Sequence, residues 1–292
     1  MANEKNAAFN PQFNLAGEFS INRMGYGAMR ITGDGIWGPP KDHDESIRVL
    51  KRAVELGISF IDTADSYGPH VSEELIAEAL HPYPAGLVIA TKGGLLRTGP
   101  NQWPVNAHPD HLKEALEGSL KRLKLDSIDL YQLHRVDPEV PFEQTLEFLQ
   151  KVQQEGKIKH IGLSEVTVDQ IKKAQEYVKI VSVQNMYSVD NRKWEEELQY
   201  CEEQNMAFIP WYPLGGGNVK ALEKLEQIGK KYEATAHQIA LSWLLHHSPN
   251  ILLIPGTSKV KHLEENFEAA SIALSPEDLT ELDKINQAEV SG

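Results

Sequence analysis

The sequence predicts an α/β fold, a (β/α)8 TIM barrel that forms a single domain over residues 1–292. Eight short apolar runs alternate with eight segments of helical periodicity, which is the pattern of a parallel sheet covered by helices. The runs are continuously apolar, as in strands that are buried on both faces, and eight such units close most simply into a barrel. A doubly wound open sheet is the alternative. It is disfavoured because Gly25-Tyr26-Gly27 is not completed to a Gly-x-Gly-x-x-Gly motif.

The expected elements begin in residues 1–20, with a frayed start and a short β-hairpin that turns at Ala16-Gly17-Glu18. Eight strands are then expected at residues 24–29, 59–62, 87–92, 129–134, 160–164, 180–185, 207–214 and 251–255. The helices between them are expected at residues 44–56, 72–80, 109–123, 141–155, 167–178, 193–205, 219–232 and 235–246. Gly57 and Gly156 support two of these helix ends, because glycine is the usual residue after a helix.

Extra helices are expected after the last strand. Residues 260–270 have helical periodicity. A final helix is predicted to start at Ser275, because a cap residue is followed there by Pro276 and by two acids, Glu277 and Asp278, near the positive end of the helix dipole.

The composition excludes several classes of protein. The chain is 41% hydrophobic and 24% charged, as in a soluble globular protein with a large core. Its net charge of −13 would repel nucleic acid and anionic membranes. Residues 1–10 lack the apolar core of a signal peptide, and no apolar run approaches the ~20 residues of a membrane span, so we expect a cytoplasmic protein. The lone Cys201 suits a reducing compartment and is interpreted as a half-buried helix residue.

Four titratable side chains lie at the ends of three successive strands. Asp62, Lys92 and His134 end the second, third and fourth strands, and Tyr67 follows on the loop after the second. In such barrels the chemistry takes place at the carboxyl ends of the strands, so these groups are expected to converge. Each of these residues alone commonly has a structural role, as an ion-paired Asp or Lys or as a buried His with its hydrogen bonds made. Structural packing does not easily explain four titratable side chains that converge on one place.

These residue types predict a proton donor with its supporting groups. Lys92 would lower the pKa of Tyr67 by stabilising the phenolate, and Asp62 would hold Lys92 charged. His134 would orient a carbonyl oxygen. A phenol that protonates a carbonyl oxygen needs a hydride at the carbonyl carbon, and this calls for a nicotinamide.

Motifs along almost the full chain resemble those of the aldo-keto reductases. They are Asp62-Thr63-Ala64-Asp65-Ser66-Tyr67-Gly68, Thr91-Lys92, Leu133-His134, Lys159-His160-Ile161-Gly162-Leu163-Ser164, Val183-Gln184-Asn185, Pro213-Leu214-Gly215, Ile254-Pro255-Gly256-Thr257-Ser258 and Glu265-Asn266. The resemblance implies the barrel, a monomer, and NADPH-dependent reduction of aldehydes and some ketones. It also implies a catalytic tetrad in the roles described above: Asp62, Tyr67, Lys92 and His134.

The same resemblance implies a cofactor site. Trp211 would stack on the nicotinamide, and Gln184 and Ser164 would bond to its carboxamide. Residues 213–216 would follow the pyrophosphate, where glycines allow close approach. Residues 257–259 would hold the 2′-phosphate at a helix start, where free amides attract anions, and residues 265 and 266 would meet the adenine. The full implied set is Gly27, Met29, Ser164, Glu165, Gln184, Trp211, Tyr212, Pro213, Leu214, Gly215, Gly216, Thr257, Ser258, Lys259, His262, Glu265 and Asn266.

Two departures from the family pattern affect the cofactor. Glu165 stands where the family usually has Asn, and an ionised carboxylate cannot donate to the carboxamide oxygen. We hypothesise that Glu165 favours the positively charged oxidised ring. Gly256 and His262 stand where the family usually has Lys and Arg for the 2′-phosphate, and Lys259, Lys261 and His262 remain as cations. NADPH is therefore expected to be preferred, with some use of NADH.

Two tryptophans are candidates for the substrate pocket. Trp37 lies in the loop Gly33–Pro40 and Trp103 in Asn101-Gln102-Trp103-Pro104, and each suits a flat or apolar substrate, although both could simply anchor their loops. The segments 33–40, 67–71 and 243–255 resemble the pyridoxal reductase branch of the family, so pyridoxal or a similar aromatic aldehyde is a candidate substrate. A general aldehyde reductase is the alternative, and the short segment after the last predicted helix suggests an open, broadly selective site.

Other classes of function also remain open. A nicotinamide-binding redox sensor would bind NADPH and turn over slowly. A Schiff-base aldolase would use Lys92, but it requires a neutral amine where Asp62 would keep the charge. A metal hydrolase is disfavoured because His and acidic residues do not fall at ligand spacings near the strand ends, so no metal is expected.

Overall fold

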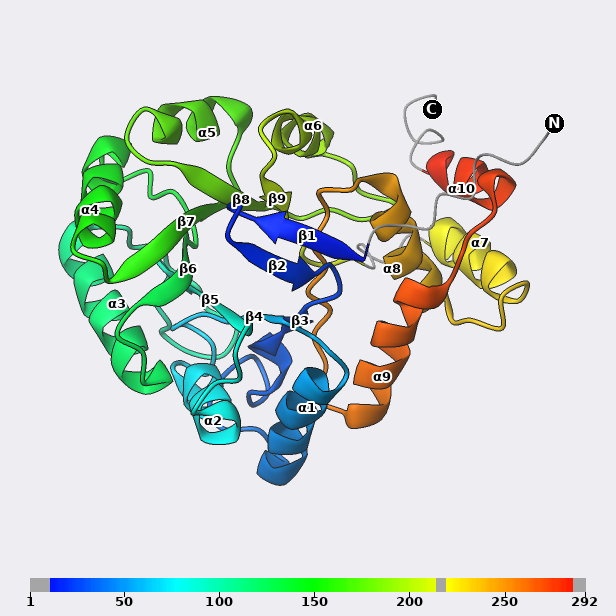
Figure 1. Ribbon diagram of the computed structural model, residues 1–292, viewed down its shortest axis with the longest axis horizontal. Coiled ribbons are helices and arrows are strands. Elements are labelled where there is room, and N and C mark those ends of the chain that lie inside the picture. The colour runs from blue at the N-terminus through cyan, green and yellow to red at the C-terminus, as the bar shows by residue number, and fades with distance from the viewer. Residues whose placement is uncertain (1–10, 214–218, 286–292) are drawn as a thin grey trace.

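A computed structural model describes residues 11–213 and 219–285 of the chain. It confirms the predicted (β/α)8 barrel, with strands inside and helices outside (Figure 1). Within the described residues, no helix is long and apolar enough to cross a membrane.

Seven parallel strands form the main sheet in chain order, as expected when each strand returns through a helix. The strands are β3 (Tyr26–Gly27), β4 (Phe60–Asp62), β5 (Val88–Gly93), β6 (Ile128–Leu133), β7 (Ile158–Ser164), β8 (Ile180–Gln184) and β9 (Ala207–Phe208). All of these strands except β9 match the predicted ranges within two residues at each end. Because neighbours run in parallel, their carboxyl ends meet at one mouth of the barrel.

The eighth predicted strand is present only as two isolated parallel bridges, Met24 to Leu253 and Phe208 to Ile251, which close the ring between β3 and β9. The predicted strands at 207–214 and 251–255 were therefore too long. Pro210 supplies a physical reason for the early end of β9, because proline has no N–H to donate to a ladder.

The helices outside the barrel follow the predicted order. They are α1 (His43–Glu55), α2 (Val71–Leu80), α3 (Pro109–Leu123), α4 (Phe142–Gln154), α5 (Val168–Gln175), α6 (Glu195–Glu203), α7 (Val219–Gly229), α8 (Ala236–His247), α9 (Val260–Glu268) and α10 (Pro276–Asp283). Side-chain caps set several of the starts: Asp42 caps α1, Thr167 and Thr235 form capping boxes, and Ser275 caps α10 as predicted. The extra C-terminal helices are α9 and α10.

The predicted N-terminal hairpin is confirmed as β1 (Gln12–Leu15) and β2 (Phe19–Asn22), and it crosses one opening of the barrel (Figure 1). Its buried side chains, Phe13, Leu15 and Ile21, pack against residues from inside the barrel, including Phe60 and Leu252. The hairpin therefore fills the amino-terminal end of the barrel and leaves the carboxyl-terminal mouth for a site.

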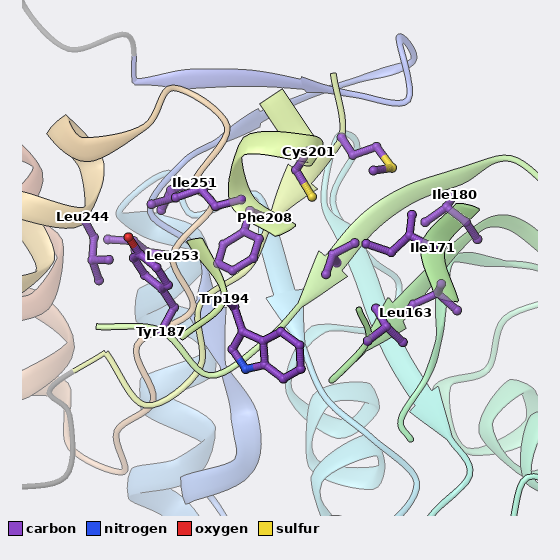
Figure 2. Packing of buried hydrophobic residues seen from close by; sticks show 14 of the residues in the cluster. Leu163, Ile171, Ile180, Tyr187, Trp194, Cys201, Phe208, Leu244, Ile251 and Leu253 are labelled. Atoms are coloured by element: carbon purple, nitrogen blue, oxygen red, sulfur yellow. The ribbon is translucent and has the colours of Figure 1, made fainter. Parts of the chain in front are cut away.

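The largest core cluster lies between the strands and the outer helices. Figure 2 shows Leu163 and Ile180 of the sheet facing Ile171 of α5, with Cys201 of α6 near Phe208 of β9. Cys201 is fully buried rather than half-buried, and burial raises the pKa of its thiol well above the ordinary value. It is a packing residue.

Candidate active site

The structure brings together the four titratable residues predicted at the strand ends. The Lys92 ammonium on β5 donates to Asp62 Oδ2 on β4 over 2.5 Å and to the Tyr67 hydroxyl over 3.3 Å. It also donates to the Thr63 carbonyl over 2.9 Å. The His134 ring stands edge to face against the Tyr67 ring, with centroids 5.9 Å apart. All four titratable residues are buried at the carboxyl-terminal mouth of the barrel.

Asp62 has two more partners inside the barrel. The side-chain amides of Gln132 and Gln184 donate to its Oδ1 over 2.9 and 3.0 Å. The carboxylate thus accepts three hydrogen bonds, one from Lys92 and one from each glutamine. Charge-assisted hydrogen bonds offset the cost of burying an ion pair, and these three bonds fix the orientation of the Asp62 side chain.

The charges in this cluster follow from burial and close neighbours. Burial alone would lower the pKa of Lys92, but the Asp62 carboxylate and Tyr67 raise it above the ordinary value, so the ammonium stays charged. Burial raises the pKa of Tyr67, although Lys92 lowers it in part. The pKa of Tyr67 is therefore raised overall, whereas the sequence predicted that Lys92 would lower it. The phenol keeps its proton, as a proton donor must.

His134 carries no charge in this setting. Burial, together with the charges of Lys92 and Arg135, holds the pKa of His134 well below the ordinary value. Its Nδ1 is buried and has no hydrogen-bonding partner in the described part of the chain. A neutral imidazole beside the phenol can hydrogen-bond to a substrate oxygen without adding a second cation to the site.

One wall beside Tyr67 is aromatic. The Trp103 ring lies edge to face against Tyr67, with centroids 6.3 Å apart. The Arg97 guanidinium lies 3.6 Å from the Trp103 ring centre and 5.5 Å from that of Trp37. Trp37 is tied to the loop after β4 by a bridge with Gly68. Trp103 therefore packs directly on Tyr67, and Trp37 is joined to this group through Arg97 and Gly68.

Arg97 joins the three loops that form this wall. It donates to the carbonyls of Gly35 and Ile36 after β3, to that of Ser66 after β4, and to those of Gly99 and Gln102 after β5. The distances run from 2.6 Å to Ile36 to 3.2 Å to Gly99. Only a planar guanidinium with five N–H donors can bind several backbones at once in this way.

The residues expected around a nicotinamide form a second cluster at the same mouth. The indole Nε1 of Trp211 and the backbone N–H of Met186 both donate to Glu165 Oε1, each over 2.7 Å. Arg135 donates to Ser164 Oγ over 3.0 Å and lies 5.8 Å from the Trp211 ring centre. Glu165 therefore orients Trp211, a role that the sequence did not reveal.

The residues expected at the 2′-phosphate lie together at the start of α9. Thr257 is buried and its Oγ1 accepts from the Lys259 N–H over 3.1 Å, whereas Lys259 and His262 are exposed. Met29 lines a cavity of about 490 Å³ together with Ser258 and Lys259.

Other predicted cofactor residues have different surroundings. Leu214, Gly215 and Gly216 lie outside the described residues, and Tyr212 and Pro213 directly precede them. Asn266 is buried and hydrogen-bonded to His237 of α8. Gly27 has a packing role: a Cβ there would lie 2.5 Å from the Ile254 carbonyl, so only glycine lets the chain close the ring at this point.

Sequence reasoning missed Gln132, Arg97 and Arg135. Gln132 is a polar residue within an apolar strand, and Arg135 directly follows His134, so both carried a local signal. Arg97 carried none, because its partners come from three loops whose proximity only the closed barrel creates.

The donor and acceptor chemistry at this mouth fits a dinucleotide. A partly exposed indole is held in place beside a buried serine hydroxyl and a buried glutamine amide, and the unpartnered His134 Nδ1 lies beside Tyr67. At α9 the exposed cation Lys259 stands at a helix start, where anions are stabilised.

Comparison with known proteins defines the class. The model of the aldo/keto reductase family matches residues 23–287, so the chain belongs to this family and is an oxidoreductase. It is 54% identical to an uncharacterized oxidoreductase of Schizosaccharomyces pombe over 94% of this chain and 89% of the relative. It is 42% identical to pyridoxine 4-dehydrogenase of Escherichia coli over 93% of this chain and 97% of that enzyme. Among solved structures, a thermostable aldo-keto reductase in complex with the inhibitor epalrestat superposes with a TM-score of 0.82 at 32% identity, covering 94% and 99% of the two chains.

Proposed function

We propose that this protein reduces aldehydes, and some ketones, to alcohols with NADPH, and that Tyr67 donates the proton. The observation that carries the proposal is the buried chain of hydrogen bonds from Asp62 through Lys92 to the Tyr67 hydroxyl, at 2.5 and 3.3 Å. This chain places one charged ammonium against one protonated phenol, and both side chains are buried. Such an arrangement stabilises the phenolate that remains after proton transfer.

Each residue of the tetrad has a separate task in this reaction. The Tyr67 hydroxyl gives its proton to the carbonyl oxygen of the substrate and is left as a phenolate. The Lys92 ammonium stabilises the resulting phenolate, and Asp62, held by its two glutamine partners, keeps Lys92 charged and aimed at Tyr67. Neutral His134 hydrogen-bonds to the same carbonyl oxygen and orients it. A bound nicotinamide would supply the hydride for the carbonyl carbon.

The cofactor would be held by two groups of residues. Trp211, fixed by Glu165, would stack on the nicotinamide, and Ser164 and Gln184 would contact its carboxamide. At the other end, the start of α9 would hold the adenosine phosphate. The few cations there support a preference for NADPH that still permits NADH.

Pyridoxal or a similar aromatic aldehyde is the proposed substrate. The aromatic wall of Trp103 and Trp37 beside Tyr67 offers flat apolar surface, and the Escherichia coli relative is named for the oxidation of pyridoxine. A broad aldehyde reductase is the second candidate. It is favoured by Trp37, which is 37% exposed and so leaves the pocket open.

The test is the steady-state oxidation of NADPH and NADH with pyridoxal and with 4-nitrobenzaldehyde. A higher kcat/KM for pyridoxal supports the vitamin-directed function, whereas an equal or higher value for the nitroaldehyde supports the broad reductase. Absence of turnover with both aldehydes, in protein that binds NADPH, would overturn the reductase and favour a nicotinamide-binding sensor. Borohydride trapping of an aldehyde on Lys92 would instead indicate Schiff-base chemistry.

A further inference from the structure

A carboxylate of the chain itself occupies the start of α9. Glu45 lies in the first turn of α1, and its Oε1 accepts a hydrogen bond from the Val260 N–H over 3.0 Å, across 215 positions of sequence. Val260 is the first residue of α9, a helix of nine residues. The free amides of a first helical turn are donors for anions, and Glu45 uses one of them.

Other contacts hold Glu45 in this position. Its backbone N–H donates to Asp42 Oδ1 over 2.9 Å as part of the α1 cap, and its Oε2 accepts from Arg48 Nε and Nη2 over 3.0 and 2.8 Å. The side chain is 17% exposed. The Val260 amide, then Arg48 and the nearby Lys259, lower the pKa of Glu45. The carboxylate at α9 is therefore ordered and negative at neutral pH.

The same helix start is where the proposed function places the 2′-phosphate of NADPH. Ser258 and Lys259 line the cavity of about 490 Å³ from the α9 side, and Asp42 and Ser46 line it from α1. The Lys259 N–H is already engaged by Thr257 Oγ1. The backbone N–H groups of Lys259 and Val260, the first two at this end of α9, thus donate to side chains of the protein itself. One of these acceptors, Glu45, is charged.

We propose that Glu45 is a specificity-determining residue that weakens binding of the 2′-phosphate and so shifts cofactor use from NADPH towards NADH. A phosphate monoester carries about −1.5 to −2 charges at neutral pH and would be repelled by the carboxylate. NAD lacks this group and meets no such repulsion. The inference rests on the proposed cofactor site, but it makes a separate claim about selectivity.

The experiment compares the dissociation constants of NADP⁺ and NAD⁺ by quenching of tryptophan fluorescence in the wild type, Glu45→Gln and Asp44→Asn. Glutamine keeps an acceptor for the Val260 N–H and removes only the charge. Asp44 is the matched control: it is an acid in the same turn of α1 whose side chain is 86% exposed and contacts His43. Asp44→Asn therefore removes the same charge without touching α9.

The expected result is that Glu45→Gln binds NADP⁺ about 5-fold more tightly while its affinity for NAD⁺ changes less than about 2-fold, an effect that high salt diminishes. Asp44→Asn should leave both constants nearly unchanged. Equal tightening of both dinucleotides, or no change in either, would overturn the role of Glu45 and leave the reductase proposal intact. If the wild type binds neither dinucleotide, both proposals fail.

Discussion

Replacing Arg97 tests whether the aromatic wall beside Tyr67 depends on a single side chain. Arg97 makes five hydrogen bonds to backbone carbonyls of three loops and stacks on Trp103 at 3.6 Å. At about 1 kcal/mol for each bond and about 0.5–1 kcal/mol for the stacking, the contacts sum to about 6 kcal/mol. Because Arg97 is part-exposed and such contributions are not additive, we expect Arg97→Ala to cost about half of this sum, about 2–3 kcal/mol.

This cost should appear in substrate binding. If the loops are ordered only part of the time, the apparent affinity for the substrate falls by that fraction. A cost of about 2–3 kcal/mol therefore predicts a rise of about 30- to 160-fold in KM for an aromatic aldehyde. The value of kcat should stay within about 3-fold, since Arg97 does not touch the tetrad in the structure. Arg97→Lys should resemble Arg97→Ala, because one ammonium cannot reach three loops.

The assay is the steady-state reduction of pyridoxal or 4-nitrobenzaldehyde, and of a short aliphatic aldehyde that does not use the wall. Lys173→Ala is the control, because Lys173 of α5 is a part-exposed cation that forms ion pairs with Glu143 of α4 and with Glu176 on the outside of the barrel. An unchanged KM for the aromatic aldehyde would refute the reasoning. An equal rise for the aliphatic aldehyde would show a general structural effect instead.

Three further predictions follow from the same geometry. Tyr67→Phe should lower kcat by at least about 10³-fold while NADPH binding changes little; a mutant that retains near wild-type turnover would remove the proton-donor assignment. Arg122→Ala should lower the free energy of unfolding in urea by about 3–5 kcal/mol, because it leaves the fully buried Glu73 carboxylate without its cation, which lies 2.7 Å away. The exposed neighbour Lys121→Ala should cost less than about 0.5 kcal/mol, and similar losses for both variants would contradict this account. Glu165→Asn should raise the affinity for NADPH relative to NADP⁺ by about 3-fold, because a negative charge near the ring is removed; an unchanged ratio of dissociation constants would dismiss the idea.

Part of this molecule could be predicted from local patterns alone. Apolar runs that alternate with helical periods specify a parallel barrel, and caps such as Ser275 set helix starts, because these signals act over a few residues. The assembly of Asp62, Lys92 and His134 was also predictable. Each ends a strand, and the ends of parallel strands meet at one mouth.

The tertiary structure decided what depends on contacts between distant segments. Arg97 binds three loops, and Glu45 reaches Val260 at the far end of the chain. Gln132 of β6 and Gln184 of β8 converge on Asp62 of β4. No local pattern encodes such pairs, because they form only when the ring closes. The direction of the shift in the Tyr67 pKa could likewise be read only from the structure. It depends on how far the effect of burial outweighs that of the nearby Lys92 ammonium, and burial is a property of the folded chain.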